Sequence, residues 1–347
     1  MAGKSVRKVK IGNLTLGDGR IYVQSMLNTR ADDIEGSVNQ AVALEKAGCE
    51  IIRASIPNED ALALIPAIKD KISVPLVADI HFNYRLAIAA CERGIDKIRI
   101  NPGNIGDMDK VKAVADCCRS HGVPIRIGVN SGSLEKDILE KYGSPTPEAL
   151  CESAMKHIEL LERFDFNDIV VSIKSSDVKR NIAAYRLMRE MTDYPLHLGV
   201  TEAGTYNMGL VKSSIGIGSL LADGIGETIR VSLTDDPVKE VEAGISILKA
   251  LNLRGGVKLV SCPTCGRTKI DLISLANRVE KALAGVDKDI TVAVMGCVVN
   301  GPGEAREADI GLAGGDGSVV IFKKDKILGK YSEEDAFLAL LGEIDKL

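Results

Sequence analysis

Residues 124–130 read Pro-Ile-Arg-Ile-Gly-Val-Asn, a short strand-like run that ends in a polar residue and precedes a helical stretch. The same order recurs eight times between residues 21 and 251. Eight such units in about 235 residues match the size of a (β/α)8 TIM barrel, so we predict an α/β fold of this type. The predicted strands are Ile21–Ser25, Glu50–Ala54, Pro75–Asp79, Lys97–Ile100, Pro124–Val129, Asp168–Ile173, Pro195–Val200 and Thr228–Ser232, and the predicted helices cover residues 34–48, 59–70, 84–93, 107–121, 146–163, 177–192, 206–223 and 236–251.

An open, doubly wound sheet is the alternative to a barrel. Several strands are dense in Val and Ile, which is typical of a parallel sheet buried on both faces. The doubly wound fold predicts a G-x-G-x-x-G loop after an early strand, and no such motif is present there. We interpret the later Gly216-Ile-Gly218 as a phosphate loop or a tight turn.

Polar and charged residues gather at the ends of the predicted strands. In a TIM barrel the active site forms at the carboxyl ends of the strands, so these side chains should meet at one mouth. Five of them are cations, and uncompensated like charges would repel one another, which indicates a site for a polyanion. The planar fork of arginine matches phosphate oxygens, so we expect a phosphorylated small molecule. The residues expected to bind it are Arg53, Asp79, His81, Arg99, Arg126, Asn130, Lys174, Thr201, Arg230 and Ser232.

Glu202 follows Thr201 directly after the seventh predicted strand. It is either a charge-balancing partner of a nearby cation or a proton donor or acceptor beside the reacting carbon, and we predict the catalytic role. Asp79 and His81 are expected to orient the ligand or an arginine. Lys174 could instead form a Schiff base as in aldolases, but its position among arginines favours phosphate binding.

A second, smaller domain follows the barrel. Gly255-Gly256 marks the boundary, so we expect a substrate-binding barrel in residues 1–252 and an α+β domain in residues 257–347. Its predicted strands are Lys258–Ser261, Ile290–Met295, Asp309–Leu312, Val319–Phe322 and Lys326–Lys330. Helices are expected over residues 269–283 and from a cap at 332–335 to about residue 344.

Three cysteines of this domain form a candidate metal site. Cys262-Pro-Thr-Cys265 can aim two thiols to one side, and Cys297 lies in Gly296-Cys-Val-Val-Asn-Gly-Pro-Gly-Glu304. The last histidine of the chain is His197, so a fourth ligand within the domain must be a carboxylate, a substrate or an open position, and Glu304 can reach back. Such a site suits a reactive iron–sulfur cluster. A structural zinc site and unligated core thiols are the alternatives.

The two cysteine motifs resemble those of the 4-hydroxy-3-methylbut-2-enyl diphosphate synthase family, reductive enzymes of the non-mevalonate isoprenoid pathway. The resemblance covers nearly the whole chain and is closest to the two-domain bacterial branch. It implies a [4Fe-4S] cluster held by Cys262, Cys265, Cys297 and Glu304. It also implies that two electrons and a proton, with flavodoxin or ferredoxin as the electron donor, convert 2-C-methyl-D-erythritol 2,4-cyclodiphosphate to (E)-4-hydroxy-3-methylbut-2-enyl diphosphate and water.

The direction of the chain predicts a homodimer. The eighth barrel helix should deliver the chain to the end of the barrel opposite the cations, and a linker of about six residues spans at most about 20 Å. We therefore expect a head-to-tail dimer in which each cluster domain caps the barrel of the other subunit. The family resemblance implies the same arrangement.

Composition narrows the class of protein further. A net charge of −4, no Trp and 3% aromatic residues argue against nucleic-acid binding. No run of about 18 apolar residues and no signal-like start is present, so we expect a cytoplasmic protein without membrane contact. Two rival functions remain at this point. One is a redox-inert barrel enzyme, such as a pterin-type synthase or an aldolase, with a structural metal lobe; the other is an iron–sulfur sensor.

Overall fold

The chain divides into two units, Met1–Leu253 and Arg254–Leu347, and each has its own apolar core. The computed structural model describes all residues except 1–4, 287, 298–304, 306 and 325. No helix in the described part of the chain is both long and apolar enough to cross a membrane.

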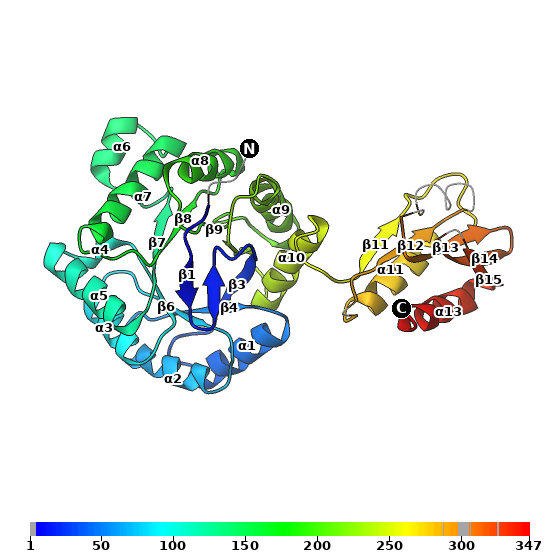
Figure 1. The fold of residues 1–347 in the computed structure, drawn as a ribbon, viewed down its shortest axis with the longest axis horizontal. Helices are drawn as coiled ribbons and strands as arrows, with labels where there is room; N and C mark the ends of the chain where they lie inside the picture. The colour runs from blue at the N-terminus through cyan, green and yellow to red at the C-terminus, as the bar shows by residue number, and fades with distance from the viewer. Residues whose placement is uncertain (1–4, 287, 298–304, 306, 325) are drawn as a thin grey trace. The chain divides into compact units, whose positions relative to one another are not determined.

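Eight parallel strands form the barrel of the first unit, which confirms the predicted fold (Figure 1). Their order is β8-β7-β6-β5-β4-β3-β10-β9, and a bridge between Val171 and Leu196 joins the two ends of the sheet, so the ring is nearly closed. The strands are β3 (Tyr22–Met26), β4 (Ile51–Ser55), β5 (Leu76–Asp79), β6 (Lys97–Ile100), β7 (Ile125–Asn130), β8 (Ile169–Lys174), β9 (His197–Leu198) and β10 (Thr228–Ile229).

Helices surround these strands in the order that the sequence predicts (Figure 1). Side-chain caps begin many of them; Asp107, for example, accepts from the backbone N–H of Lys110, and Asp177 from that of Arg180. Two short helices, α4 and α6, were not predicted. The helices are α1 (Ile34–Lys46), η1 (Asp60–Ala63), α2 (Leu64–Lys69), α3 (Tyr84–Glu92), α4 (Pro102–Ile105), α5 (Met108–His121), α6 (Lys136–Tyr142), α7 (Pro147–Glu162), α8 (Val178–Met191), α9 (Tyr206–Ala222) and α10 (Pro237–Ala250).

A hairpin closes the amino end of the barrel. Strands β1 (Val9–Ile11) and β2 (Leu14–Leu16) pair antiparallel. Their apolar side chains pack against the first inward residues of the barrel strands, among them Tyr22, Ile51 and Val170. This apolar plug leaves the carboxyl ends of the strands as the open end of the barrel.

The two-residue alternation of each strand separates an apolar outside from a polar inside. In β8, Ile169, Val171 and Ile173 pack into the large core beneath the helices, whereas Ser172 and Lys174 face the barrel interior. The strands can therefore bury a continuous apolar surface against the helices while presenting charges at the open end.

The second unit is a mixed five-stranded sheet with helices on one face. The strand order is β11-β12-β13-β14-β15. The first three strands run parallel to one another, β14 pairs antiparallel with β13, and β15 pairs antiparallel with β14. Helices α11 (Leu272–Leu283) and α13 (Glu333–Asp345) pack on one face through a shared apolar cluster. The strands are β11 (Lys258–Ser261), β12 (Thr291–Met295), β13 (Ile310–Gly315), β14 (Ser318–Lys323) and β15 (Lys326–Tyr331).

Candidate active site

The open end of the barrel contains a cavity of about 190 Å³ that collects all ten residues predicted to bind substrate. Most come from the carboxyl ends of the strands or from the loops that follow, whereas Arg126 is the second residue of β7 and reaches the cavity from within the barrel. Ser172 on β8 also lines the cavity and was missed. The signal was present, because Ser172 lies two residues before Lys174 and so shares its inward face. The predicted residues are Arg53, Asp79, His81, Arg99, Arg126, Asn130, Lys174, Thr201, Arg230 and Ser232.

Asp79 lies between the arginines of the two neighbouring strands and the imidazole of His81, which follows its own strand. Its carboxylate lies 3.1 Å from Arg99 Nη1, 3.8 Å from Arg53 Nε and 3.7 Å from His81 Nε2. Burial alone would raise the pKa of Asp79, but the charges of the arginines and the hydrogen bond with His81 hold it well below its usual value. Asp79 therefore stays ionised and fixes the orientation of both guanidinium groups.

Arg230 is held by a second acid behind the cavity. Its Nη2 and Nε donate to Glu240 at 3.1 and 3.2 Å, and its Nη1 donates to Ser232 Oγ at 2.8 Å. Glu240 is buried on α10 and also accepts from Ser25 Oγ at 3.0 Å. The paired geometry aligns the guanidinium of Arg230 at the cavity wall.

Arg126 and Lys174 are buried cations with no acidic partner in the described part of the chain. Arg126 is 1% exposed, and its Nε and Nη1 make no hydrogen bond to the described residues. Burial, together with the neighbouring arginines, lowers the pKa of Arg126 and that of Lys174 well below their usual values. A bound anion would compensate both groups, so the cavity has the electrostatics of a polyanion site.

Glu202 lies beside the cavity without lining it. It follows Thr201, its side chain is exposed, and its backbone φ is +51°, in the left-handed region that non-glycine residues rarely adopt. Such conformations recur at functional sites, but Asp165, Asn252 and Lys324 also adopt one and do not line the cavity. The strained turn places Glu202 at the rim next to Thr201.

Two of the predicted thiol ligands follow neighbouring parallel strands of the second unit. Cys262 comes directly after β11, and Cys297 comes two residues after β12. Ser261 pairs with Val294 in this ladder, and the backbone N–H of Gly296 donates to Cys262 Sγ at 3.1 Å. The two cysteine-bearing segments therefore meet at the same edge of the sheet.

Cys265 is presented on an exposed turn beside that edge. Its backbone N–H donates to Thr268 Oγ1 at 3.2 Å, and its carbonyl accepts from the N–H of Thr268 at 3.0 Å. Hydrogen bonds from the backbone and side chain of Arg267 lower the pKa of the Cys265 thiol. A thiol that ionises readily is suited to metal ligation.

The predicted fourth ligand, Glu304, lies outside the described residues. Within the described part of the chain, no three Cys, His, Asp or Glu side chains converge to hold one metal ion. A [4Fe-4S] cluster takes one protein ligand for each iron, so its ligands need not converge on one atom. Soft thiol donors at one sheet edge, one of them readily ionised, fit such a cluster.

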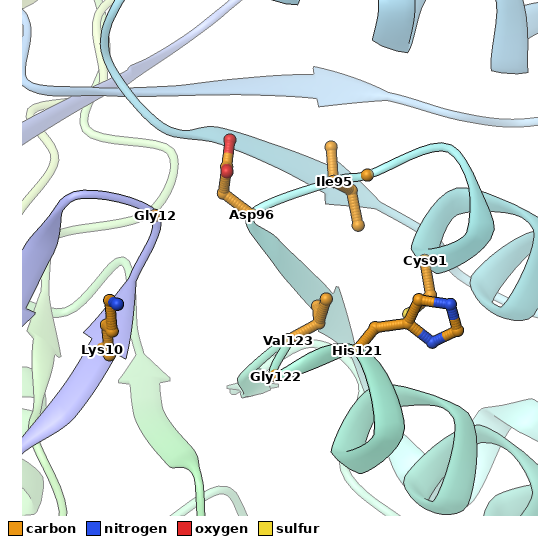
Figure 2. Close-up of a pocket in the computed structure, with 9 residues that line it drawn as sticks. Lys10, Gly12, Cys91, Ile95, Asp96, His121, Gly122 and Val123 are labelled. Atoms are coloured by element: carbon orange, nitrogen blue, oxygen red, sulfur yellow. The ribbon is translucent and has the colours of Figure 1, made fainter.

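A larger cavity of about 400 Å³ lies near the amino ends of the barrel strands (Figure 2). Figure 2 shows Lys10 on the hairpin across from Cys91 and His121. Asp96 in its wall is already engaged by Lys69 Nζ at 2.8 Å and by the N–H of Leu76, and a hydrogen bond with Cys118 raises the pKa of the Cys91 thiol. Asp96, Cys91 and His121 are thus engaged in structural bonds, and the charged residues predicted from the strand ends lie at the other cavity, so we do not assign the active site here.

Models of two protein-family domains match the chain: the GcpE TIM-barrel domain matches residues 6–245, and the GcpE protein C-terminal domain matches residues 258–346. The "4-hydroxy-3-methylbut-2-en-1-yl diphosphate synthase (flavodoxin)" of Clostridium perfringens is 56% identical over 349 residues, covering 100% of both chains. The protein of that name from Caldanaerobacter subterraneus subsp. tengcongensis is 58% identical, covering 99% of this chain and 98% of its own.

Among solved structures, a Xanthomonas albilineans dihydropteroate synthase aligns with a TM-score of 0.51 at 14% identity, covering 71% of this chain and 98% of its own. A likeness at that identity concerns the fold alone. The domain models and the full-length relatives together show that the chain belongs to the GcpE family.

Proposed function

We propose that this chain is a 4-hydroxy-3-methylbut-2-en-1-yl diphosphate synthase, which converts 2-C-methyl-D-erythritol 2,4-cyclodiphosphate to (E)-4-hydroxy-3-methylbut-2-enyl diphosphate. The family and the full-length relatives of that name support the activity. The observation that carries the substrate class is the cavity in which five cations face one acid. A cyclic diphosphate supplies the negative charge that this cavity lacks.

The cations bind the diphosphate and stabilise the charge that develops on it. When the ring C–O bond breaks, its electron pair moves to the phosphate oxygen, which the nearby guanidinium and ammonium groups stabilise. Asp79 holds Arg53 and Arg99 in place before substrate arrives, and Glu240 does the same for Arg230. Positions fixed in advance cost little reorganisation during the reaction.

Glu202 is the proposed proton donor for the departing hydroxyl group. Its place at the rim, directly after the cavity residue Thr201, supports this role. The overall change consumes two electrons and one proton and releases water. Replacing Glu202 with Gln should therefore lower kcat while leaving the affinity for substrate nearly unchanged.

Cys262, Cys265, Cys297 and Glu304 are the proposed ligands of a [4Fe-4S] cluster, which when bound supplies the electrons of the reduction. We assign substrate binding to the barrel, residues 1–252, and the cluster to residues 257–347. Reduced flavodoxin is the proposed electron donor, in keeping with the names of the relatives, and ferredoxin is the alternative. A cytoplasmic location suits a soluble electron donor of this kind.

A head-to-tail homodimer is proposed to bring the two half-sites together. Helix α10 starts beside Ser25 near the carboxyl end of β3, and its Gly244 packs on Val23 further back, so the helix carries the chain towards the amino end of the barrel. The chain thus leaves the barrel at the end opposite the cavity. Mixing Cys297→Ser subunits with Arg126→Ala subunits should restore activity if the site is shared between subunits; no recovery would contradict the shared site.

Anaerobic purification followed by iron analysis and turnover tests the function. We expect a brown protein with about four irons per chain that forms the product when reduced flavodoxin is supplied. A colourless zinc protein would instead favour the redox-inert barrel enzyme. A protein that carries a cluster but does not turn over the cyclodiphosphate, even with a chemical reductant, would favour the sensor.

A further inference from the structure

Behind Lys174 lies a buried hydrogen-bonded pair, His197 and Thr228, which the preceding account of the reaction does not use. Lys174 Nζ is 3.4 Å from His197 Nε2, and His197 Nδ1 is 2.8 Å from Thr228 Oγ1. Both residues are fully buried on β9 and β10 and do not line the cavity. The pair therefore touches the cavity only through Lys174.

The chemistry of the three groups determines where the protons lie. In the charged form that a bound phosphate favours, Lys174 can only donate, so His197 Nε2 accepts from it. A neutral imidazole has one N–H, so Nδ1 carries it and donates to Thr228 Oγ1. Burial and the nearby charges of Arg126 and Lys174 hold the pKa of His197 well below its usual value, so the ring stays neutral. Thr228 thus accepts from the tautomer that can receive Lys174 and holds the ring in place.

In the same part of the barrel, β8 and β9 are the neighbouring strands with the fewest paired residues, and we call their junction the seam. Strands β8 and β9 share only the bridge between Val171 and Leu196. Tyr185 on α8 spans this seam: its hydroxyl accepts from the N–H of Ile173 at 3.2 Å and donates to the carbonyl of His197 at 2.6 Å. Because Ile173 precedes Lys174, these two hydrogen bonds of Tyr185 fix the spacing between Lys174 and His197.

The surroundings leave Lys174 little other freedom. A Cβ at Gly199 would lie 2.8 Å from Lys174 Nζ and 3.1 Å from its Cε, so the backbone directly after β9 packs closely against the lysine side chain. Among the residues that the structure describes, His197 is the only hydrogen-bond partner of Lys174 Nζ. After burial, the charges that act most strongly on its ammonium form are those of four arginines, which repel it.

We propose that His197 and Thr228 are positioning residues that hold the ammonium of Lys174 against an anionic phosphate in the cavity. This inference rests on the proposed function, because it assigns the anion to the cyclodiphosphate. Without His197 Nε2 as an acceptor, repulsion from the surrounding arginines would displace the ammonium of Lys174, and it would no longer point at the phosphate. The pair acts through Lys174 and does not itself touch substrate.

Substitutions at Thr228 provide the test. Thr228→Val keeps the shape and removes the hydroxyl, whereas Thr228→Ser keeps the hydroxyl. Steady-state kinetics of the reduced holoenzyme with the cyclodiphosphate should give a KM about 5- to 10-fold higher for Thr228→Val, with kcat within about twofold of wild type. Titration with inorganic pyrophosphate should show a matching loss of affinity. Thr228→Ser should restore both values to within about twofold of wild type.

Thr192→Val is the matched control. Thr192 is buried, and its hydroxyl accepts from the N–H of Tyr194 at 3.2 Å, so the variant also loses a buried hydrogen bond, but away from the cavity. It should lower the Tm without changing KM. If Thr228→Val does not fold, His197→Gln and His197→Leu replace it, because Gln keeps an acceptor and a donor and Leu keeps neither.

Several outcomes would overturn the inference: an unchanged KM and pyrophosphate affinity in Thr228→Val, no rescue by Thr228→Ser, or an equal rise in KM in Thr192→Val. With the second pair, equal KM values in the two His197 variants would do so. A wild-type holoenzyme that does not turn over the cyclodiphosphate would contradict the proposed function instead. The pyrophosphate titration would still decide whether the pair positions Lys174.

Discussion

Replacing Asp79 with Asn should destabilise the empty protein more than the ligand-bound protein. Of the described residues that line the cavity, Asp79 is the one acid, and it is 5% exposed. Removing one partner of a buried ion pair costs about 3–5 kcal/mol, and Asn retains the shape and one acceptor, so we expect a loss near 3 kcal/mol. For a unit of this size, the Tm should fall by roughly 6–12 °C.

Thermal unfolding with and without inorganic pyrophosphate measures this effect. A bound polyanion supplies the charge that the variant lacks, so saturating pyrophosphate should shrink the Tm deficit by about half or more. Asp193→Asn is the control, since Asp193 pairs with Arg7 at 3.3 Å on the surface and should shift the Tm by only about 3 °C or less. The reasoning is refuted if Asp79→Asn is as stable as wild type, or if pyrophosphate stabilises both proteins equally.

The pH dependence of the same variant gives a second check. The native pKa of Asp79 lies below its unfolded value, so its contribution to stability is complete above the unfolded pKa of about 4 and is lost as the pH falls towards the native pKa. The Tm difference between wild type and Asp79→Asn should therefore be constant near neutral pH and narrow below about pH 4. A difference that widens in acid would contradict the assignment of a stabilising carboxylate.

Three further predictions concern other parts of the chain. In the cluster-free protein at pH 8, iodoacetamide should alkylate Cys265, whose thiol pKa is lowered, at least about 10-fold faster than Cys117, whose pKa is raised to about 11; peptide mass spectrometry would show equal rates if this is wrong. Gly199→Ala should weaken pyrophosphate binding about 10-fold or more, because its Cβ would lie 2.7 Å from the carbonyl oxygen of Arg230 and 2.8 Å from Lys174 Nζ, and unchanged calorimetric affinity would contradict this. Arg126→Met should raise the Tm of the empty protein by a few degrees while abolishing pyrophosphate binding, since it replaces a buried, unpaired cation with an apolar side chain of similar length; a lower Tm would contradict the charge argument.

The sequence predicts the barrel well because each strand carries a local signal. All eight predicted strands overlap observed ones, and every predicted barrel helix is present. The short helices α4 and α6 were missed because Pro102-Gly103-Asn104 has the composition of a turn and α6 lies within a polar loop. Gly216 was misinterpreted as part of a phosphate loop or a turn: it lies within α9, where a Cβ would approach Val200 Cγ2 to 2.5 Å. The glycine permits close helix–strand packing, a tertiary requirement without a local signature.

The cavity residues were predictable because barrel geometry brings all strand ends together. Which of these residues contact one another was not predictable. Glu240 lies ten residues beyond Arg230 on a helix, and the sequence does not show that it faces the cavity arginine rather than solvent. The contact between Lys174 and His197 depends equally on the seam between β8 and β9, where a shift of one residue would turn either side chain outward. Alternation identifies the inward face of a strand, but only the register between strands decides which inward residues touch.

The opposite expectations for Asp79 and Arg126 follow from one imbalance of charge. Five cations line the cavity, and the acids that pair with them, Asp79 and Glu240, leave Arg126 and Lys174 without an acidic partner among the described residues. Removing the acid increases the imbalance, and removing an unpaired cation reduces it, so the first change costs stability and the second adds it. A bound polyanion shrinks the first effect and reverses the second, because it stabilises only the folded state that presents the cations and Arg126→Met no longer binds it. The barrel can sustain this imbalance since the outward faces of the same strands bury a continuous apolar core that does not depend on the cavity. The empty site is therefore electrostatically unfavourable, and this is the property that makes it bind a diphosphate.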